Sequence, residues 1–479
     1  HTPSDSGAVN ASAVAIKAEG SDVELVVYEK LGLGNGNMAG NPWLQELPDP
    51  ISKACWDNYL AVSIKYAREN GINEGDIVKV SANGHEVEVP VLIQPGTYPG
   101  TVALAFGYGR TNVSKAGEGI GANAYPFMSY TGSRSMLATK VSVSKTGMKT
   151  TIAQTQTHHT IEGRNIVKET TLDKYAVNPA DGNVRPYIQV KQADGTFTKV
   201  YPGINRNAIT LWDKRDYEGH HWAMAVDLNA CTGCGACIVS CQVENNVPVV
   251  GKQEVLNRRE MHWIRLDRYY TFNEDGMSID KEKEYSMIQN GDNVQVAFQP
   301  VMCMQCDNAP CETVCPVLAT VHSDEGLNQM VYNRCVGTRY CANNCPYKVR
   351  RFNWFSYTDN PKFYNNPSQT DLGRMVLNPD VTVRARGVME KCTFCVQRIQ
   401  AGKLEAKRNG RGVLDGDVKT ACQQSCPSGA IVFGDLNDEN SEVSKLFLNE
   451  RAYGIIEELN VLPSVNYLTK VRNTQSIKA

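Results

Sequence analysis

The sequence lacks long apolar runs, an excess of one charge and repetitive segments. No stretch approaches the roughly 18–20 continuous apolar residues of a membrane-spanning helix, and the mean hydropathy is −0.36. A net charge of −2 over 479 residues gives no reason to expect a nucleic-acid partner. The chain shows no secretory signal pattern, and because it starts at His1 we expect the true beginning to lie upstream. The length predicts two or three folded domains.

Cysteine is nearly absent outside one region. Of the 16 cysteines, only Cys55 lies outside residues 222–435, and we expect it to be an ordinary buried thiol. A chain this long, with 42% hydrophobic residues, can form a core without disulfides. The other cysteines form four motifs: Cys231, Cys234, Cys237 and Cys241; Cys303, Cys306, Cys311 and Cys315; Cys335, Cys341 and Cys345; and Cys392, Cys395, Cys422 and Cys426.

The spacing within these motifs is typical of iron–sulfur ligation. The first motif is a C-x2-C-x2-C-x3-C run, and Pro316, Pro346 and Pro427 each follow the last cysteine of another motif, as in bacterial ferredoxins. The fourth motif has a 26-residue insertion between its two pairs. Two-residue gaps in tight turns point successive sulfurs inward, toward one cluster. Zinc sites use two C-x2-C pairs without the cysteines and proline that follow here. The pattern predicts an electron carrier.

The rest of the chain predicts mixed helices and strands. We expect a helix at 61–70, strands at 76–81 and 86–93 around the Asn83-Gly84 turn, and helices at 396–408 and 444–459. The sequence character changes near residues 150 and 220. The predicted organisation is a first domain at 1–149, a polar connector at 150–220, a cluster domain at 221–437 and a C-terminal helix and tail at 438–479.

Residues 222–435 resemble the four-cluster ferredoxin-like subunits of molybdopterin oxidoreductase complexes, such as nitrate, dimethyl sulfoxide and polysulfide reductases. The resemblance implies two nested ferredoxin folds, with outer motifs paired and inner motifs paired. It also implies three [4Fe–4S] clusters and one [3Fe–4S] cluster, with iron as the metal. The implied ligands are Cys231, Cys234, Cys237 and Cys426 (site I); Cys241, Cys392, Cys395 and Cys422 (site II); Cys303, Cys306, Cys311 and Cys345 (site III); and Cys315, Cys335 and Cys341 (site IV).

Thr338 stands where the third motif calls for a cysteine. A threonine hydroxyl is a poor iron ligand beside sulfide, because its pKa is far too high for easy deprotonation. The simplest outcome is a three-iron cluster held by three thiolates, and several relatives with another residue here carry one. The alternatives are a four-iron cluster with water on the open iron and an empty site. In this family the three-iron centre usually has the higher potential, which suits it to receive electrons from a quinol.

The first region has a resemblance of its own. Asn41–Pro50 and Trp56–Asn58, with the later stretches Gly107–Arg110, Gly117–Gly121 and Asn123–Tyr125, look like the C-terminal dinucleotide-binding domain of molybdopterin oxidoreductases. That domain is a six-stranded β-barrel whose glycines let the backbone approach the phosphates of the pterin cofactor. The same glycines would also be needed simply to shape the barrel. The expected fold class is α+β: a β-barrel domain followed by a nested double ferredoxin-like domain.

The order of the two modules is similar to that in the large iron–sulfur subunit of alternative complex III. The stretch from Gln154 to Arg164 also resembles that subunit. The resemblance implies electron transfer from membrane quinol toward cytochrome c haems, at the periplasmic face of a bacterial inner membrane after export in folded form. It implies no molybdopterin and no substrate chemistry on this chain. The implied partners are an NrfD-like integral membrane quinol-binding subunit, multihaem and monohaem cytochrome c subunits, and in some assemblies a terminal oxidase.

Two other functions stay open at this point. A molybdopterin oxidoreductase, such as a polysulfide or thiosulfate reductase, would carry its metal ligand upstream of His1. A mainly structural scaffold would hold clusters that are not reducible at quinol potential. The pairs His158-His159 and His220-His221 are predicted packing or surface residues, because adjacent side chains do not easily face one haem or metal. The basic residues between Lys348 and Arg411 would either balance cluster charge, dock an acidic cytochrome or form a solvated face.

Overall fold

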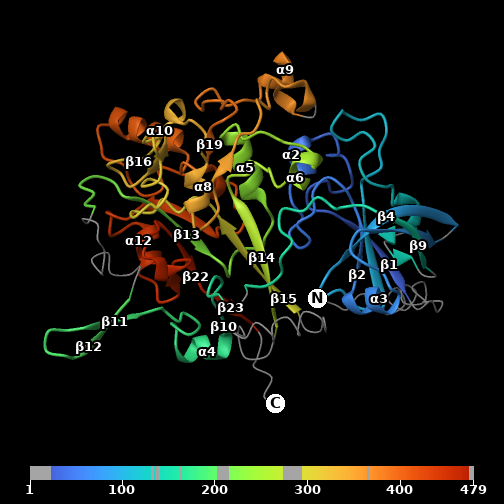
Figure 1. Ribbon diagram of the computed structural model, residues 1–479, viewed down its shortest axis with the longest axis horizontal. Helices are drawn as coiled ribbons and strands as arrows, with labels where there is room; N and C mark the ends of the chain where they lie inside the picture. The colour runs from blue at the N-terminus through green and yellow to red at the C-terminus, as the bar shows by residue number, and fades with distance from the viewer. Residues whose placement is uncertain are drawn as a thin grey trace, which may run out of the picture. The chain divides into compact units, whose positions relative to one another are not determined.

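The computed structural model describes residues 23–82, 84–130, 134–135, 137–138, 141–161, 164–201, 215–272, 294–363 and 366–473. These residues form two compact units of mixed helices and strands (Figure 1). Unit 1 takes the residues up to Thr155 together with Gly251–Leu256 and Val294, and unit 2 takes the others. Among the described residues, every helix is too short or too polar to cross a membrane.

Unit 1 is built on a seven-stranded mixed sheet with the order β8-β1-β5-β2-β4-β3-β9. β1 runs parallel to β5 and β2 parallel to β4, and the other neighbours are antiparallel. Alternate residues of β3 are buried, as expected for a strand with one face on the core. The strands of the sheet are β1 (Glu24–Glu29), β2 (Leu60–Val62), β3 (Asp76–Ala82), β4 (His85–Ile93), β5 (Thr101–Phe106), β8 (Leu137–Ala138) and β9 (Ser142–Lys149). The unit also contains β6 (Ser129–Tyr130), β7 (Arg134–Ser135), α2 (Pro42–Glu46), α3 (Ile64–Glu69) and α6 (Lys252–Leu256).

The predicted β-barrel is not found among the described residues. β8 and β9 each pair with a single neighbour, so the sheet is open at both edges. β9 is exposed along most of its length, and it therefore has no continuous apolar face that closure would bury. The fold class is mixed α/β, and the barrel is a correction to the expectation from sequence.

Two of the predicted elements differ from the structure for identifiable reasons. The helix expected at 61–70 is α3, which starts at Ile64 because the Ser63 hydroxyl caps it by accepting from the Tyr66 amide at 3.0 Å. The buried residues before it form β2 instead. The helix expected at 444–459 is wrong in extent: α12 (Glu442–Phe447) ends early, and β21 (Ala452–Tyr453) follows because it pairs with β22 (Val465–Leu468). The β3–β4 hairpin is confirmed.

Unit 2 centres on a four-stranded sheet with the order β20-β13-β22-β21. β13 (Trp222–Asp227) pairs antiparallel with β20 (Ile431–Asp435) and parallel with β22. α12 covers this sheet, with Val443 packed against Ala223, Ala225 and Val432. The helices that carry or follow cysteines are α5 (Ala236–Glu244), α8 (Tyr340–Asn344), α10 (Val396–Arg408) and α11 (Ala421–Gln424). The predicted helix at 396–408 is thus confirmed as α10.

Short two-stranded ladders complete unit 2. They are β10 (Glu169–Thr171) with β23 (Lys470–Arg472), β11 (Ile188–Lys191) with β12 (Phe197–Val200), β14 (Arg265–Phe272) with β15 (Val294–Val301), β16 (Thr320–His322) with β17 (Asn328–Met330), and β18 (Arg351–Phe352) with β19 (Met389–Glu390). The remaining helices are α4 (Leu172–Val177) and α9 (Asp371–Arg374), with 3-10 turns at Tyr125–Phe127 in unit 1 and at Tyr332–Arg334, Pro361–Phe363, Pro367–Gln369 and Glu457–Leu459 in unit 2. The connector residues therefore include regular structure, and β11 and β12 extend as an arm in Figure 1.

Candidate metal centres

All four cysteine motifs begin with the same backbone turn. The second residue after the first cysteine of each motif lies in the left-handed region: Gly233 (φ 76°), Gln305 (φ 49°), Gly337 (φ 75°) and Phe394 (φ 55°). Such a turn brings successive backbone N–H groups to one side, which forms an anion-binding concavity. For a residue with a side chain this conformation costs roughly 1–2 kcal/mol, so the surrounding structure must hold Gln305 and Phe394 in place.

Sequence reasoning missed this shared turn, because only two of the four positions are glycine. The third motif keeps the turn although Thr338 replaces the cysteine that would follow it. At Gly337 a side chain is excluded by the chain itself, since an added Cβ would lie 2.5 Å from the Gly387 carbonyl oxygen. Thr338 therefore follows the same backbone turn as the cysteines at the corresponding position of the other three motifs.

Site I brings together cysteines from the first and fourth motifs. The Cys237 thiol interacts electrostatically with those of Cys231, Cys234 and Cys426. Burial raises the pKa of Cys237 and of Cys231 above the ordinary thiol value. Burial also acts to raise the pKa of Cys426, but hydrogen bonds from the Ser428 hydroxyl and from backbone amides hold it below its usual value. Donors directed at this sulfur favour a thiolate.

Site II is wholly buried. The Cys241 thiol on α5 interacts with the thiols of Cys392, Cys395 and Cys422, and burial is the main cause that raises its pKa. The side-chain amide of Asn245 lies 3.6 Å from the Cys241 sulfur and 3.8 Å from the Cys395 sulfur, and it donates to both. Burial raises the pKa of Cys422 to about 12. These thiols are thus costly to ionise unless iron binds them.

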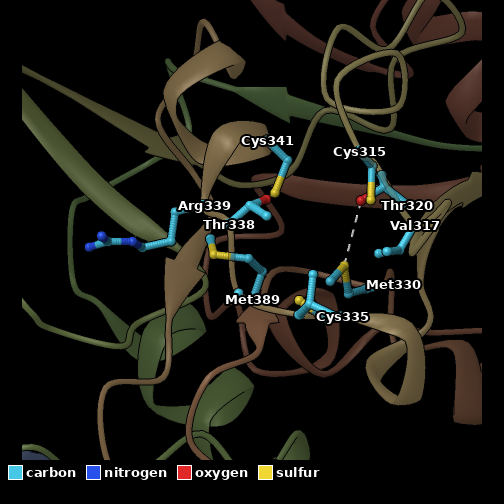
Figure 2. Close-up of a pocket in the computed structure, with 11 residues that line it drawn as sticks. Cys315, Val317, Thr320, Met330, Cys335, Thr338, Arg339, Cys341 and Met389 are labelled. Carbon is cyan, nitrogen blue, oxygen red and sulfur yellow. Dashed lines mark hydrogen bonds between the residues drawn. The ribbon is translucent and has the colours of Figure 1, made fainter.

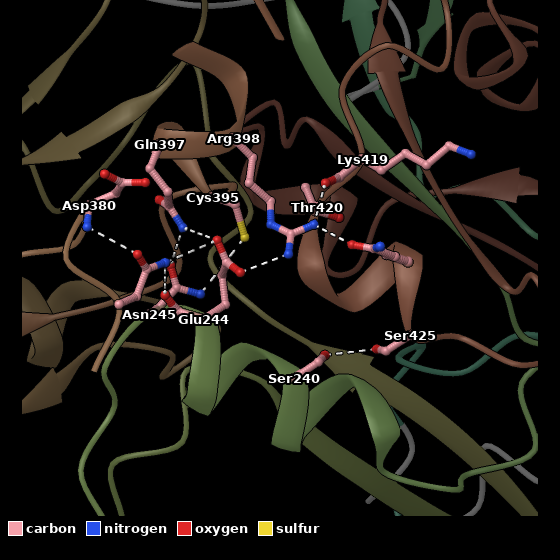
Figure 3. Close-up of polar contacts among 12 residues, drawn as sticks. Ser240, Glu244, Asn245, Asp380, Cys395, Gln397, Arg398, Lys419, Thr420 and Ser425 are labelled. Atoms are coloured by element: carbon pink, nitrogen blue, oxygen red, sulfur yellow. Dashed lines mark hydrogen bonds and ion pairs between the residues drawn. The ribbon is translucent and has the colours of Figure 1, made fainter. Parts of the chain in front are cut away.

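Polar contacts hold the helices around site II (Figure 3). Glu244 at the end of α5 accepts from the Arg398 guanidinium of α10 at 2.7 Å, and from the Gln397 amide at 2.9 Å. The hydroxyls of Ser240 on α5 and Ser425, just after α11, lie 2.8 Å apart. These contacts join the three helices that carry or precede the cysteines of sites I and II.

Site III is also wholly buried. The Cys306 thiol interacts with those of Cys303, Cys311 and Cys345, and burial raises its pKa well above the ordinary value. Burial raises the pKa of Cys311 to about 11, although the nearby guanidinium of Arg350 acts to lower it. Arg350 donates to the Cys311 sulfur at 3.0 Å. A cation and a thiolate are therefore natural partners at this site.

Site IV lies at a small pocket that is open to solvent. Cys315, Cys335 and Cys341 line it together with Thr338, and Figure 2 shows the three sulfurs around a common space. The Cys341 thiol interacts with those of Cys335 and Cys315. Burial acts to raise the pKa of Cys315, but three backbone amides, including that of Ala319 at 3.2 Å, hold it below the usual thiol value.

Sites I, II and III adjoin in that order, site IV adjoins site III through Arg350, and the burial of the four sites differs. Cys237 of site I interacts with Cys422 of site II, and Cys392 of site II interacts with Cys303 of site III. Every cysteine of sites II and III is buried. The cysteines that are partly exposed all belong to sites I and IV, and they are Cys231, Cys234, Cys426, Cys315 and Cys335. The series therefore has buried middle sites and two ends that reach the surface.

The donor set fits iron–sulfur clusters better than single metal ions. Among the described residues, no three His, Cys, Asp or Glu side chains converge as a single ion would require. Zinc needs sulfurs about 2.3 Å from one point, whereas a cluster holds its thiolates farther apart, on separate irons. Hydrogen-bond donors lie at several of these sulfurs, and such hydrogen bonds help to set the reduction potentials of iron–sulfur clusters.

The glycine-rich stretches of unit 1 pack against the protein itself. A Cβ on Gly109 would lie 2.4 Å from the Asn123 amide, and one on Gly121 would lie 2.6 Å from the Asn58 side-chain oxygen. A Cβ on Gly36 would lie 2.6 Å from the Gly107 carbonyl oxygen. Protein atoms fill the space at these glycines, so close approach of neighbouring loops explains them without a pterin.

The other residues singled out in the sequence have packing roles. Cys55 is buried, as predicted. His220 stacks on Trp222 with ring centroids 4.8 Å apart and pairs with Asp435 at 2.6 Å, and His221 packs against the tilted ring of Tyr217. His158 and His159 pack near Tyr269 and Tyr270. The histidine pairs are thus accounted for by contacts within the chain.

Comparison with known families separates the same two modules. Residues 45–132 match the molybdopterin dinucleotide binding domain, and residues 230–319 and 294–360 match 4Fe-4S dicluster domains. Together the two dicluster matches span three of the four motifs, from Cys231 to Cys345, while the fourth motif lies beyond them.

Curated relatives match about half of this chain. The iron–sulfur cluster-binding subunit of menaquinone reductase from Nitratidesulfovibrio vulgaris is 39% identical over 52% of this chain and 89% of its own length. A putative iron–sulfur subunit of dimethyl sulfoxide reductase from Halobacterium salinarum is 32% identical over 52% of this chain and 79% of its own. An iron–sulfur subunit of an Hdr-like menaquinol oxidoreductase from Archaeoglobus fulgidus is 31% identical over 52% of this chain and 84% of its own.

Proposed function

This chain belongs to the iron–sulfur subunits of the molybdopterin oxidoreductase family, and we propose that it relays electrons from membrane quinol toward cytochrome c haems, as in alternative complex III. In this role the chain passes single electrons between partners and carries no substrate chemistry of its own. Bound iron–sulfur clusters supply one-electron redox centres.

One observation carries the proposal: the series of sites has a partly exposed end at site I and another at site IV, with buried sites between them. A relay needs an entry and an exit within reach of partners, and it needs the middle shielded from solvent. Clusters that only stabilised the fold would need no such ordered series. The interactions between neighbouring sites, I with II and II with III, support electron passage along the same order.

We assign the clusters by the grouping of the thiols. Sites I, II and III, with four cysteines each, would hold [4Fe–4S] clusters. Site IV, with three cysteines and Thr338, would hold a [3Fe–4S] cluster. Ionised thiolates are needed at all of them, and burial makes those thiolates unstable in the absence of metal, which couples metal binding to folding.

The partners and location are proposed from similarity. Two of the relatives are named for menaquinone or menaquinol, which supports a quinone-linked role here. The partners would be an NrfD-like membrane subunit that binds quinol, near site IV, and cytochrome c subunits that accept electrons. The assembly would lie at the periplasmic face of a bacterial inner membrane.

The first experiment is elemental analysis of the purified intact complex, with haem iron subtracted. Three four-iron clusters and one three-iron cluster predict about fifteen non-haem irons per chain, with no molybdenum or tungsten. Far fewer irons in protein prepared without air, or clusters that quinol cannot reduce, would contradict the relay.

The match of residues 45–132 to the molybdopterin dinucleotide binding domain favours a second candidate, a molybdopterin oxidoreductase such as a polysulfide or thiosulfate reductase. One molybdenum or tungsten per chain in the same analysis would select it. The packing of Gly109 and Gly121 against neighbouring loops weighs against it, since contacts within the chain account for these two glycines.

A further inference from the structure

Arg350 is a buried cation that no carboxylate of the described residues pairs with. Only 6% of the residue is exposed, and it lies just before β18. Among the described residues no Asp or Glu oxygen lies within 4 Å of its guanidinium. Arg384, which is equally buried, instead pairs with Glu390 at 2.7 Å. An unpaired buried charge is strongly unfavourable, so negative charge of another kind must lie beside Arg350.

The hydrogen bonds of Arg350 point toward two sites at once. On one side Nη2 donates to the Cys311 sulfur of site III at 3.0 Å and to the Asn328 side-chain oxygen at 2.8 Å. On the other side Nη1 donates to the Thr320 hydroxyl at 3.2 Å and to the Met330 sulfur at 3.7 Å. Thr320 and Met330 line the cavity of site IV (Figure 2). The guanidinium therefore lies between sites III and IV.

Thiols of both sites interact with the charge. Besides Cys311, the guanidinium interacts with Cys303 and Cys345 of site III and with Cys341 of site IV. Arg350 thus interacts with the last two members of the series. The similarly buried Arg384 also interacts with the Cys241 thiol of site II, but it has Glu390 as its counter-charge.

We propose that Arg350 is a positioning residue that holds one positive charge between sites III and IV and thereby raises the reduction potential of both. This inference rests on the proposed function, since it requires clusters at both sites. A thiolate-bound cluster gains negative charge when it accepts an electron, and a fixed cation beside it stabilises the reduced form. The interaction is strong because little water is present to screen it. Hydrogen bonds to the sulfurs and net charge are two of the factors that set cluster potentials.

The effect is expected at site IV as well as at site III. At site III the guanidinium donates directly to a ligand sulfur at 3.0 Å. On the side of site IV it donates to Thr320 and Met330, and it also forms a hydrogen bond with the Cys341 thiol.

The test uses the full chain in its purified complex, titrated with reductant while electron paramagnetic resonance follows each cluster. Arg350→Gln removes the charge and keeps a polar side chain. Arg350→Lys keeps the charge and loses the fork of donors. Arg351→Gln is the matched control, because Arg351 is adjacent and pairs with Glu260 at 2.8 Å, while its other hydrogen bond goes to the His262 carbonyl.

In Arg350→Gln we expect the equilibrium constant for reduction to fall about tenfold at one four-iron centre, or about 59 mV for a one-electron couple. A fall is also expected at the three-iron centre. Arg350→Lys should give smaller shifts at both, and Arg351→Gln none. Unchanged potentials in Arg350→Gln, or equal shifts in Arg351→Gln, would overturn the inference. If Arg350→Gln loses its iron, Arg350→Met, which also removes the charge, decides: unchanged potentials in that variant would overturn the inference and lowered ones would support it. Wild-type protein without cluster signals would instead overturn the proposed function.

Discussion

Thr338 is the residue that most sharply distinguishes site IV from the other three sites. It follows the left-handed Gly337, at the position that Cys234, Cys306 and Cys395 occupy in their motifs. Its side chain lines the same cavity as the three cysteines of the site. The backbone is thus arranged for a fourth ligand, and only the side chain is of the wrong chemistry.

We therefore expect Thr338→Cys to convert the three-iron centre to a four-iron one. The three-iron signal of the oxidised protein should disappear, and non-haem iron should rise by about one per chain. Electron paramagnetic resonance together with iron analysis measures both. Thr338→Ser is the control and should keep the three-iron signal, because it changes only a methyl group. Persistence of that signal in Thr338→Cys would show that the loop holds residue 338 away from the metal.

Glu390 carries a second prediction at this scale. Its carboxylate is fully buried, pairs with Arg384 at 2.7 Å and accepts from the Trp263 ring and the Asn353 amide. Glu390→Gln leaves the Arg384 charge buried without a counter-charge. We expect a loss of about 3–5 kcal/mol in stability, measured by denaturant unfolding without air.

An exposed ion pair provides the comparison for that loss. Asp371 is fully exposed and contacts Arg374 at 3.4 Å. Removing such a pair by Asp371→Asn should leave stability close to that of the wild-type chain, because solvent screens exposed charges. Similar losses in Asp371→Asn and Glu390→Gln would mean that the buried pair is not a major source of stability.

At the scale of elements, the entry turn of each motif places its cysteines. Gly337 needs φ 75° and lies so close to the Gly387 carbonyl that no side chain fits. Gly387 itself has φ 89°, but an added Cβ there would meet nothing within 4 Å. The two glycines share backbone strain and differ in steric contact, which makes them a matched pair.

Gly337→Ala should displace the loop between Cys335 and Cys341 and abolish the three-iron signal, while the four-iron signals remain. Gly387→Ala should keep all signals and cost only the left-handed strain of about 1–2 kcal/mol. Resonance spectra of the two variants, prepared side by side, check this. A three-iron signal of wild-type size in Gly337→Ala would show that the loop can relax without moving its cysteines.

The elements show which parts of the structure the sequence could predict. α10 is found at the residues expected, because its boundaries lie between a cysteine motif and Asn409-Gly410. The extent of α12 was wrong, since Tyr453 pairs with Tyr467 in another part of the chain and local pattern does not reveal that pairing. The barrel failed for the same reason: strand order is a long-range property. Arg350 was visible only as one of many basic residues, and its place between two sites depends on tertiary packing.

At the scale of the molecule, the two units differ in their dependence on metal. All the cysteines proposed as cluster ligands lie in unit 2. Among the described residues of unit 1, the only cysteine is the buried Cys55. The proposed clusters join segments far apart in sequence, such as Cys231 with Cys426. Unit 1 instead has its own apolar core, which includes Leu25, Val78 and Leu104.

Removal of iron with a chelator under reducing conditions should therefore unfold much of unit 2 and leave unit 1 folded. Metal binding at such sites is part of the folding free energy. Amide hydrogen exchange followed by mass spectrometry can locate the loss: β13 and α5 should lose protection, and β3 and β4 should keep it. Equal loss of protection in both units would contradict this independence.

Dioxygen and peroxide attack cluster sulfur and iron from the solvent side. Solvent reaches cysteines at sites I and IV, whereas those of sites II and III are buried. Oxidative damage in air would thus start at the clusters of sites I and IV and reach those of sites II and III later. A sample kept in air would stop exchanging electrons with its partners while its inner clusters still gave it a brown colour. Colour alone would therefore overstate how much functional protein remains.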